Sequence, residues 1–182
     1  FGGVIPLEGS SITYTGPVQF RMGKSMHKVE VRQIKGTGAF ASKAGNEQKT
    51  FRVEYILPYS FICFYGIINE NAAKTTLLTD EDVDLLNEAI WNGTKNLISR
   101  SKFGQMPRLL IEVTYKDPGY FIGDLDKYIK LDTELSDEKI RSIEDFKLDI
   151  SEFIKKIEEN KEKIEKVEYI AYDKLKFDDE SK

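Results

Sequence analysis

The pattern of apolar and polar residues predicts a β-rich first third of the chain. Residues 1–8 predict a short apolar strand that ends near Pro6, and residues 10–35 carry further extended, β-rich patterns. Residues 50–68 are dense in aromatic and β-branched residues, which predicts a central strand, or two strands, with a break or an edge at Pro58. Between these runs, Phe40 is the only bulky apolar residue in a glycine-rich segment, so we expect a protruding β-hairpin or loop there.

The middle of the chain predicts two helices followed by a strand. Residues 69–73 predict a turn into a short helix, and Thr79 is a good N-cap for a helix that runs to about Ser99. Apolar residues recur at helical spacing through this second segment. Residues 109–115 predict a strand, because they are mostly apolar or β-branched and the turn sequence of residues 117–119 follows them.

The last third has a different character. Ser136 is a candidate cap for a short helix over residues 137–144, and a long amphipathic helix is expected from Ile150 to Ile164. Glu and Lys stand four residues apart along it, at Glu152–Lys156, Glu159–Lys163 and Glu162–Lys166. Residues 167–172 alternate like a closing strand. This order predicts an α+β fold in which helices cover one face of a ferredoxin-like sheet, as in RNA-recognition-motif domains.

Charge is distributed unevenly along the 182 residues. The net charge is -4, but residues 1–52 carry +5 while residues 117–182 carry -7. A basic region on an acidic protein favours a localised site for a polyanion. The chain begins at Phe1 rather than at methionine, which indicates a fragment of a longer protein. No apolar run is long enough for a membrane helix and no leader pattern is present, so neither a membrane nor secretion is predicted.

Few residues are suited to catalysis or to holding a metal. The sequence has one histidine, His27, and one cysteine, Cys63, so a metal site of the usual His/Cys type lacks ligands and no cofactor is predicted. Cys63 lies in an apolar run, which favours a buried, inert thiol. Residues 36–38 are not a phosphate-binding loop, because no Gly-Lys-Ser/Thr follows at the required spacing.

Binding of a nucleic acid has more support. Cations of the first third are interspersed with aromatic residues and methionines, and these two classes of side chain neutralise phosphates and pack on bases respectively. For most of the apolar residues core packing is the default, but Phe40 stands in a polar loop with little core to join. Arg100 and Lys102 follow the end of a predicted helix, where they could equally complement the helix C-terminus.

Three motifs in order resemble one known family. They are the run from Gly16 to His27, the segment 91–94 (Trp-Asn-Gly-Thr) and the segment 99–105 (Ser-Arg-Ser-Lys-Phe-Gly-Gln). The chain is similar, up to about residue 131, to the guide-RNA-coating backbone subunit of type I CRISPR surveillance complexes (Cascade; the Csh/Csd-like branch of the Repeat-Associated Mysterious Protein superfamily). The resemblance implies a modified RNA-recognition-motif palm with a β-hairpin thumb, and a first strand and helix of the family that precede Phe1.

Carried onto this chain, the resemblance implies a palm over residues 1–131, a thumb over about residues 35–50, and a helical extension with a closing strand over residues 132–182. It implies the following RNA-binding residues: Gln19, Arg21, Lys24, Ser25 and His27 along the RNA path, Arg32, Lys35, Phe40, Lys43 and Lys49 in the thumb, and Arg100 and Lys102 as a second contact. The implied partners are the guide RNA (crRNA), the target DNA strand paired to it, copies of the chain in a helical filament and other subunits, in the prokaryotic cytoplasm.

Two other functions stay open from the sequence. One is an endoribonuclease of the same superfamily that processes CRISPR RNA, with His27 as the general acid or base. The other is a protein-interaction module whose basic region meets an acidic partner. A guide carrier suits the sequence best, because basic residues on glycine-rich loops hold phosphates without reading bases.

Overall fold

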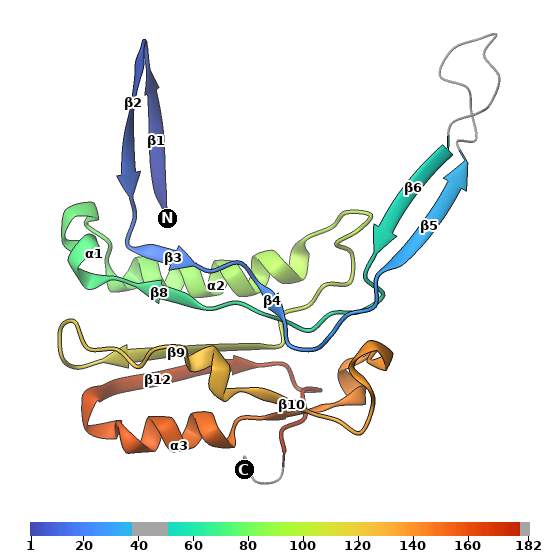
Figure 1. The fold of residues 1–182 in the computed structure, drawn as a ribbon. Helices are drawn as coiled ribbons and strands as arrows, with labels where there is room; N and C mark the ends of the chain where they lie inside the picture. Colours follow the sequence, from blue (N-terminus) through green and yellow to red (C-terminus); the bar gives the residue numbers. More distant parts are fainter. Residues whose placement is uncertain (38–50, 179–182) are drawn as a thin grey trace.

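A computed structural model describes residues 1–37 and 51–178 of the chain. It is a mixed α/β structure, in agreement with the predicted α+β class (Figure 1). The strands of this described part pair only two by two, and every pair is antiparallel. The pairs are β1 (Gly2–Leu7) with β2 (Ser10–Thr15), β3 (Val18–Phe20) with β8 (Gly66–Ile68), β4 (Lys24–Ser25) with β7 (Ile62–Cys63), β5 (Arg32–Thr37) with β6 (Phe51–Ile56), β9 (Leu109–Tyr115) with β12 (Ile164–Ala171), and β10 (Lys130–Asp132) with β11 (Lys147–Asp149).

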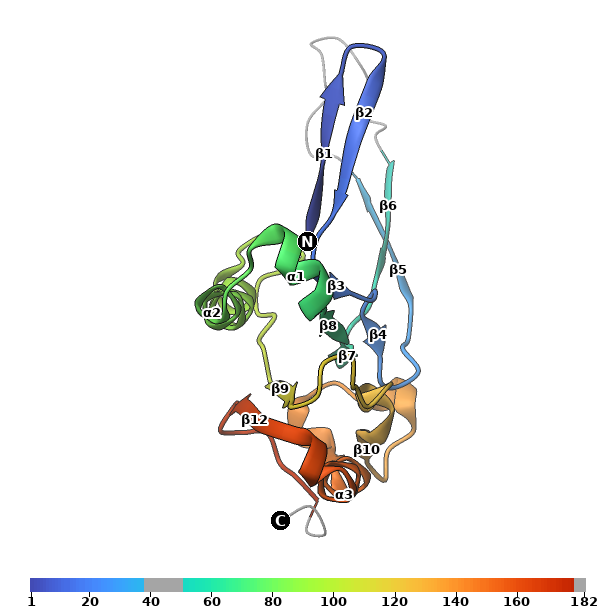
Figure 2. The ribbon, with the colours of Figure 1, turned by 90° about the vertical axis from the view of Figure 1, so that its left-hand side faces the viewer.

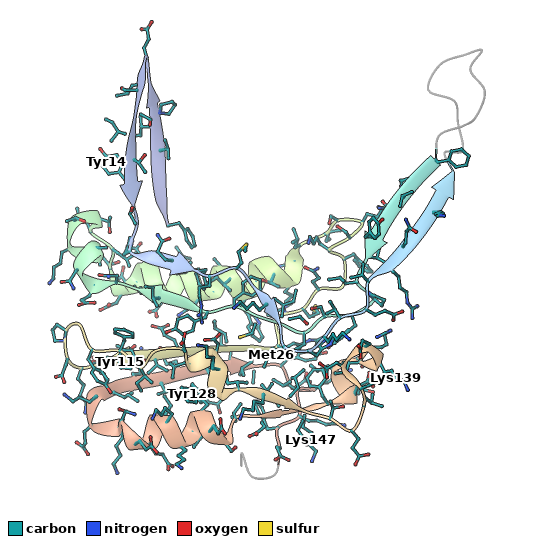
Figure 3. All side chains as sticks on the ribbon, viewed as in Figure 1. Tyr14, Met26, Tyr115, Tyr128, Lys139 and Lys147 are labelled. Carbon is teal, nitrogen blue, oxygen red and sulfur yellow. The ribbon has the colours of Figure 1, made fainter. Side chains whose placement is uncertain are left out.

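Two hairpins, β1–β2 and β5–β6, project from the same side of the molecule (Figures 1 and 2). Every residue of β1 and β2 is exposed, including Tyr14 near the base of the first hairpin (Figure 3). Because cross-strand partners share a face, the register Gly3↔Tyr14 and Ile5↔Ile12 places the large apolar side chains of this hairpin together. The opposite face carries mainly small residues and hydroxyls.

The hydrophobic stretch of residues 50–68 is not a central strand. Its first part, β6, belongs to the projecting hairpin, where Phe51 is 78% and Tyr55 is 70% exposed. The break predicted at Pro58 is present, and the rest of the stretch forms the short strands β7 and β8. Aromatic and β-branched residues fit any pleated surface, so their strand propensity carries no information on whether the strand is covered.

Helices α1 (Glu70–Thr76) and α2 (Asp80–Asn96) form where the sequence predicts them. The Asn69 side chain accepts hydrogen bonds from the backbone N–H groups of Asn71 and Ala72 and so caps α1. Thr79 forms a capping box with Asp82 at the start of α2. The chain passes between the two helices through Leu77 in the left-handed conformation, with φ 59°.

The main apolar core lies late in the chain. Ile140 and Leu148 are completely or almost completely buried, and Ile143, Phe146 and Leu175 pack with them. Residues from the first half of the chain, Met26, Tyr59 and Phe61 among them, pack against this cluster. The β9–β12 pair and this core therefore join the segment after residue 131 to the segment before it.

The predicted helix over residues 137–144 is wrong. The segment instead forms two 3₁₀ turns, Asp137–Lys139 and Ile143–Asp145, and Ser136 makes no capping hydrogen bond. Ser142 caps the second turn, and the carboxylate of Asp145 accepts hydrogen bonds from the backbone N–H groups of Arg141 and Ser142. These local bonds let the chain bend so that Ile140 and Ile143 both enter the core.

Helix α3 (Ser151–Glu159) is shorter than the predicted helix over residues 150–164. Asn160 ends it, because its side chain donates to the carbonyl of Lys156 and accepts from the hydroxyl of Tyr120. Ile164 then starts β12, where it is buried. The predicted Glu–Lys pairs do not form, since the ion pairs are instead Glu152–Lys130, Lys163–Asp117, Lys156–Glu159 and Lys166–Glu168. No helix in the described part of the chain is both long and apolar enough to cross a membrane.

Candidate nucleic-acid interface

The β5–β6 hairpin is the part of the predicted thumb that the structure describes. Its register pairs Gln33 with Tyr55 and Lys35 with Val53, so these residues share one face with Phe51. That face joins two exposed aromatic rings to the exposed cation Lys35. Exposed rings beside a cation form a stacking platform of the type that single-stranded nucleic acids use.

The other face of the hairpin is charged. Arg32, Arg52 and Glu54 lie on it, and Ile34 stands between them. Glu54 binds both Arg52, at 2.8 Å, and Arg100 from the loop that follows α2. These arginines hold the pKa of the Glu54 carboxyl below its usual value, the Arg100 hydrogen bond being the largest cause. Glu54 therefore stays ionised and links the hairpin to the body of the molecule.

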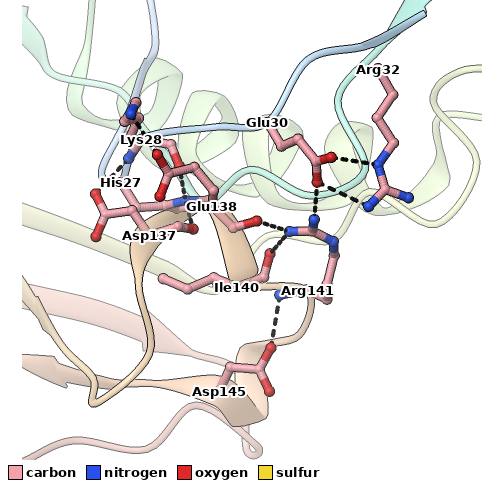
Figure 4. A network of polar contacts seen from close by, with 9 residues as sticks. All are labelled: His27, Lys28, Glu30, Arg32, Asp137, Glu138, Ile140, Arg141 and Asp145. Atoms are coloured by element: carbon pink, nitrogen blue, oxygen red, sulfur yellow. Dashed lines mark hydrogen bonds and ion pairs between the residues drawn. The ribbon is translucent and has the colours of Figure 1, made fainter.

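The root of the hairpin is anchored by a second polar network, drawn in Figure 4. Glu30 accepts hydrogen bonds from Arg32 at 2.8 and 3.0 Å and also binds Arg141. Arg141 donates in addition to the backbone carbonyls of Glu138 and Ile140. Lys28 contacts Glu138 at 2.5 Å. Arg32 is thus held by Glu30, and Glu30 in turn is held by Arg141, which lies 111 positions further along the chain.

His27 is 7% exposed and is part of this anchor. Its Nε2 accepts a hydrogen bond from the backbone N–H of Phe61 at 3.2 Å. Nδ1 lies 3.1 Å from the carbonyl oxygen of Lys28 and 3.2 Å from that of Asp137, so it carries the proton and donates. The ring also stacks on Tyr59, with centroids 6.0 Å apart. Both ring nitrogens are therefore occupied by backbone groups.

Arg21 is held by two carboxylates and a ring. Its guanidinium contacts Asp124 at 3.1 Å and Asp126 at 2.6 Å, and it lies 4.5 Å from the centroid of the Tyr65 ring. The side chain is still 44% exposed. Burial raises the pKa of the Tyr65 hydroxyl above its usual value.

The remaining residues of the predicted RNA path divide into two groups. Gln19 donates to the carbonyls of Phe1 and Gly16, and Ser25 donates to the carbonyl of His27, so both brace the local backbone. Lys24 is exposed and has no ion pair within the described residues. It lines a groove of about 350 Å³ together with Arg21, Met22 and Tyr65.

The predicted residues are spread over several elements, from β3 and β4 to the β5–β6 hairpin and the loop after α2, rather than gathered at a point. Lys24, Lys35 and Lys102 are exposed, and none has an ion-pair partner in the part of the chain that the structure describes. Arg21, Arg32 and Arg100 are in ion pairs but remain partly exposed. Phe40, Lys43 and Lys49 lie outside the described residues.

Sequence analysis missed the residues that hold these cations. Asp124 and Asp126 bind Arg21, and Glu54 binds Arg100, from distant positions. Arg141 binds Glu30, the partner of Arg32, from a distant position too, and no local signal marks any of these residues. For Tyr55 the alternation of the strand could have indicated an outward position opposite Gln33.

The described residues contain no candidate metal site. No group of three or more His, Cys, Asp or Glu residues in the described ranges is arranged to hold a metal ion. Cys63 is half-buried rather than buried, and this partial burial raises the pKa of its thiol.

Comparison with known proteins gives two matches. A family model described as CRISPR-associated protein Cas7 matches residues 1–151. A CRISPR-associated protein Cas7 from Haloferax volcanii is 32% identical over 169 residues, which cover 91% of this chain and 49% of that protein. The chain thus spans about half the length of the curated relative that it matches.

Proposed function

This chain belongs to the Cas7 family of CRISPR-associated proteins, and from that premise we propose that it binds CRISPR guide RNA without reading its sequence. It acts as the backbone subunit of a type I interference complex in antiviral defence. The observation that carries the proposal is the projecting β5–β6 hairpin, which places Lys35 on one face with the exposed rings of Phe51 and Tyr55. Cations that hold phosphates and rings that stack on any base bind RNA of any sequence.

The remaining assignments rest on the family. Residues 1–131 form a modified RNA-recognition-motif palm, the β5–β6 hairpin is the base of its thumb, and residues 132–182 form an extension attached through β9–β12. Copies of the chain follow one another along the guide RNA and assemble with other subunits of the complex in the prokaryotic cytoplasm. The bases stay free to pair with a target DNA strand.

A structural role suits His27 better than a catalytic one. A general acid or base must reach the proton that it transfers. In this structure both nitrogens of His27 are hydrogen-bonded to backbone groups, and the ring is buried. We therefore propose that the chain is not an enzyme. From the family, we propose that the basic region serves RNA rather than an acidic protein.

The test uses the full-length protein, co-expressed with a repeat–spacer array and its neighbouring subunits, followed by sequencing of the RNA that purifies with it. Uniform guide-length RNA is the expected result, whereas no RNA or random cellular fragments would refute the proposal.

A second experiment tests which surface of the protein binds RNA. The double variant Lys24→Gln with Lys35→Gln should weaken RNA binding and reduce the salt slope by roughly 0.7 for each phosphate that the protein no longer neutralises. Lys74→Gln with Lys155→Gln, on α1 and α3, is the matched control for removal of two exposed positive charges. Equal binding by the double variant and the control would refute the surface assignment.

A further inference from the structure

Glu54 pairs with two arginines, whereas a structural ion pair needs only one. One oxygen of Glu54 accepts from Nη2 of Arg52 at 2.8 Å, and the other binds Nη2 of Arg100. Arg52 belongs to the hairpin, and Arg100 belongs to the loop that follows α2, which runs beside the root of the hairpin (Figure 1). One carboxylate thus holds two guanidinium groups next to each other where the hairpin contacts the loop after α2.

Most donors of the two arginines remain unused. A guanidinium has five N–H donors in a fixed fork. In the described part of the chain, Arg52 and Arg100 each give only one nitrogen, Nη2, to Glu54. Their side chains are 58% and 69% exposed, while that of Glu54 is 26% exposed. The carboxylate therefore lies beneath two cations whose open N–H edges face solvent.

The network at Glu30 shows the contrast. It also holds two arginines, but Arg141 donates through its Nη1 to the backbone carbonyls of Glu138 and Ile140, and Arg32 binds Glu30 through two of its nitrogens. That network is closed by the protein itself. At Glu54 no backbone group of the described residues takes the remaining donors.

The backbone next to Arg52 leaves room for a ligand. The register places Gly36 directly opposite Arg52 on the same face of the hairpin. A Cβ built on Gly36 meets no atom within 4 Å, so the surface of the hairpin is open at Gly36, across from the backbone of Arg52. Lys102, in the same loop as Arg100, adds another exposed cation.

We propose that Arg52 and Arg100 form a clasp for one phosphodiester group of RNA and that Glu54 is the positioning residue that keeps the two guanidinium groups together. The inference rests on the proposed RNA-binding function. It adds a specific phosphate site, which a residue of the chain itself, Glu54, organises. Two guanidinium forks that converge on one phosphate give charge-assisted bonds with defined geometry. The contact between the β5–β6 hairpin and the loop after α2 thereby becomes a fixed point for the RNA backbone.

The direction in which one substitution changes the RNA affinity distinguishes this positioning role from a simple effect of net charge. Glu54→Gln removes a negative charge, so Coulomb attraction alone predicts tighter RNA binding. The clasp predicts the opposite, because without the carboxylate the two guanidinium groups repel and separate. We expect Glu54→Gln in the full-length protein to weaken binding of a single-stranded oligouridylate by roughly threefold to tenfold, a fraction of the loss expected from a lost charge-assisted bond.

The control is Glu168→Gln, which removes a carboxylate that is paired with Lys166 on β12 and is 51% exposed, more than Glu54. We expect the control to bind as tightly as the unaltered protein or slightly more tightly. The thermal unfolding midpoint of both variants should match that of the unaltered protein, because exposed ion pairs contribute little to stability. Tighter or unchanged binding by Glu54→Gln overturns the positioning role.

A double-mutant cycle tests the shared phosphate. Arg52→Gln and Arg100→Gln should each weaken binding roughly tenfold, and the pair together by well under the roughly hundredfold that independent contacts give, because both lose the same phosphate. Full additivity overturns the clasp. No RNA binding by the unaltered protein overturns the proposed function as well as the clasp. Binding that falls in the Lys24 and Lys35 double variant but rises in Glu54→Gln overturns the clasp alone.

Discussion

Replacing His27 by alanine separates a structural histidine from a catalytic or RNA-contacting one. The ring is 7% exposed and is hydrogen-bonded to the backbone of Lys28, Phe61 and Asp137. Its loss leaves the N–H of Phe61 without an acceptor, which costs about 1–3 kcal/mol for a buried donor. Loss of the bond from Nδ1 adds about 1 kcal/mol. We therefore expect His27→Ala to lower the free energy of unfolding by about 2–4 kcal/mol, before any cavity cost.

Equilibrium unfolding in urea measures this change, and RNA affinity is then measured where the variant is still fully folded. Lys24→Ala is the control, because Lys24 is exposed and has no ion pair in the described residues. We expect the control to unfold like the unaltered protein. Folded His27→Ala should retain its affinity for RNA. A loss of stability below about 0.5 kcal/mol, the range of ordinary surface changes, or an RNA affinity that falls while stability does not, would refute the structural role.

Four further predictions follow from the contacts described above. Leu148→Ala should destabilise the protein by about 2–5 kcal/mol because the side chain is 1% exposed, whereas Leu85→Ala, 63% exposed, should lie within about 0.5 kcal/mol in the same urea titration. Thr79→Ala removes the cap of α2 and should cost about 1 kcal/mol, and Thr79→Ser should restore most of the loss. Burial raises the pKa of the Cys63 thiol, so less thiolate is present at a given pH and alkylation by iodoacetamide should be slower than for the urea-unfolded chain; equal rates would contradict the burial. Tyr55→Ala should weaken RNA binding by up to about 1–3 kcal/mol for a lost base stack with no change in unfolding, since the ring is 70% exposed, and unaltered affinity would remove it from the interface.

Local chemistry made part of the fold predictable. The caps at Asn69 and Thr79 act within three residues of their own position, so the starts of α1 and α2 could be derived from adjacent letters. Strand β9 and the turn after it follow from a run of apolar residues and the Asp-Pro-Gly sequence at residues 117–119. Such signals need no information from distant parts of the chain.

The failures occurred where distant contacts compete with local propensity. Helical spacing continued from Ile150 to Ile164, yet Ile164 is buried as the first residue of a strand paired with β9. Asn160 ends the helix through a bond to Tyr120, forty positions earlier. Periodicity cannot report that a partner strand is available, so the length of α3 was overestimated.

The sequence by itself determined the kinds of side chain that this protein offers to a polyanion: a basic, glycine-rich first third with aromatic residues among the cations. It also determined where the helices begin, because capping bonds are short-range. Only the tertiary structure decided which cations are free and which are held. Arg21 is bound by carboxylates more than a hundred positions away, and Arg100 meets Glu54 across forty-six positions, whereas Lys24 and Lys35 stay exposed. The physical reason is that charge is a property of a residue, but its neutralisation depends on which distant residues the fold brings within a few ångströms.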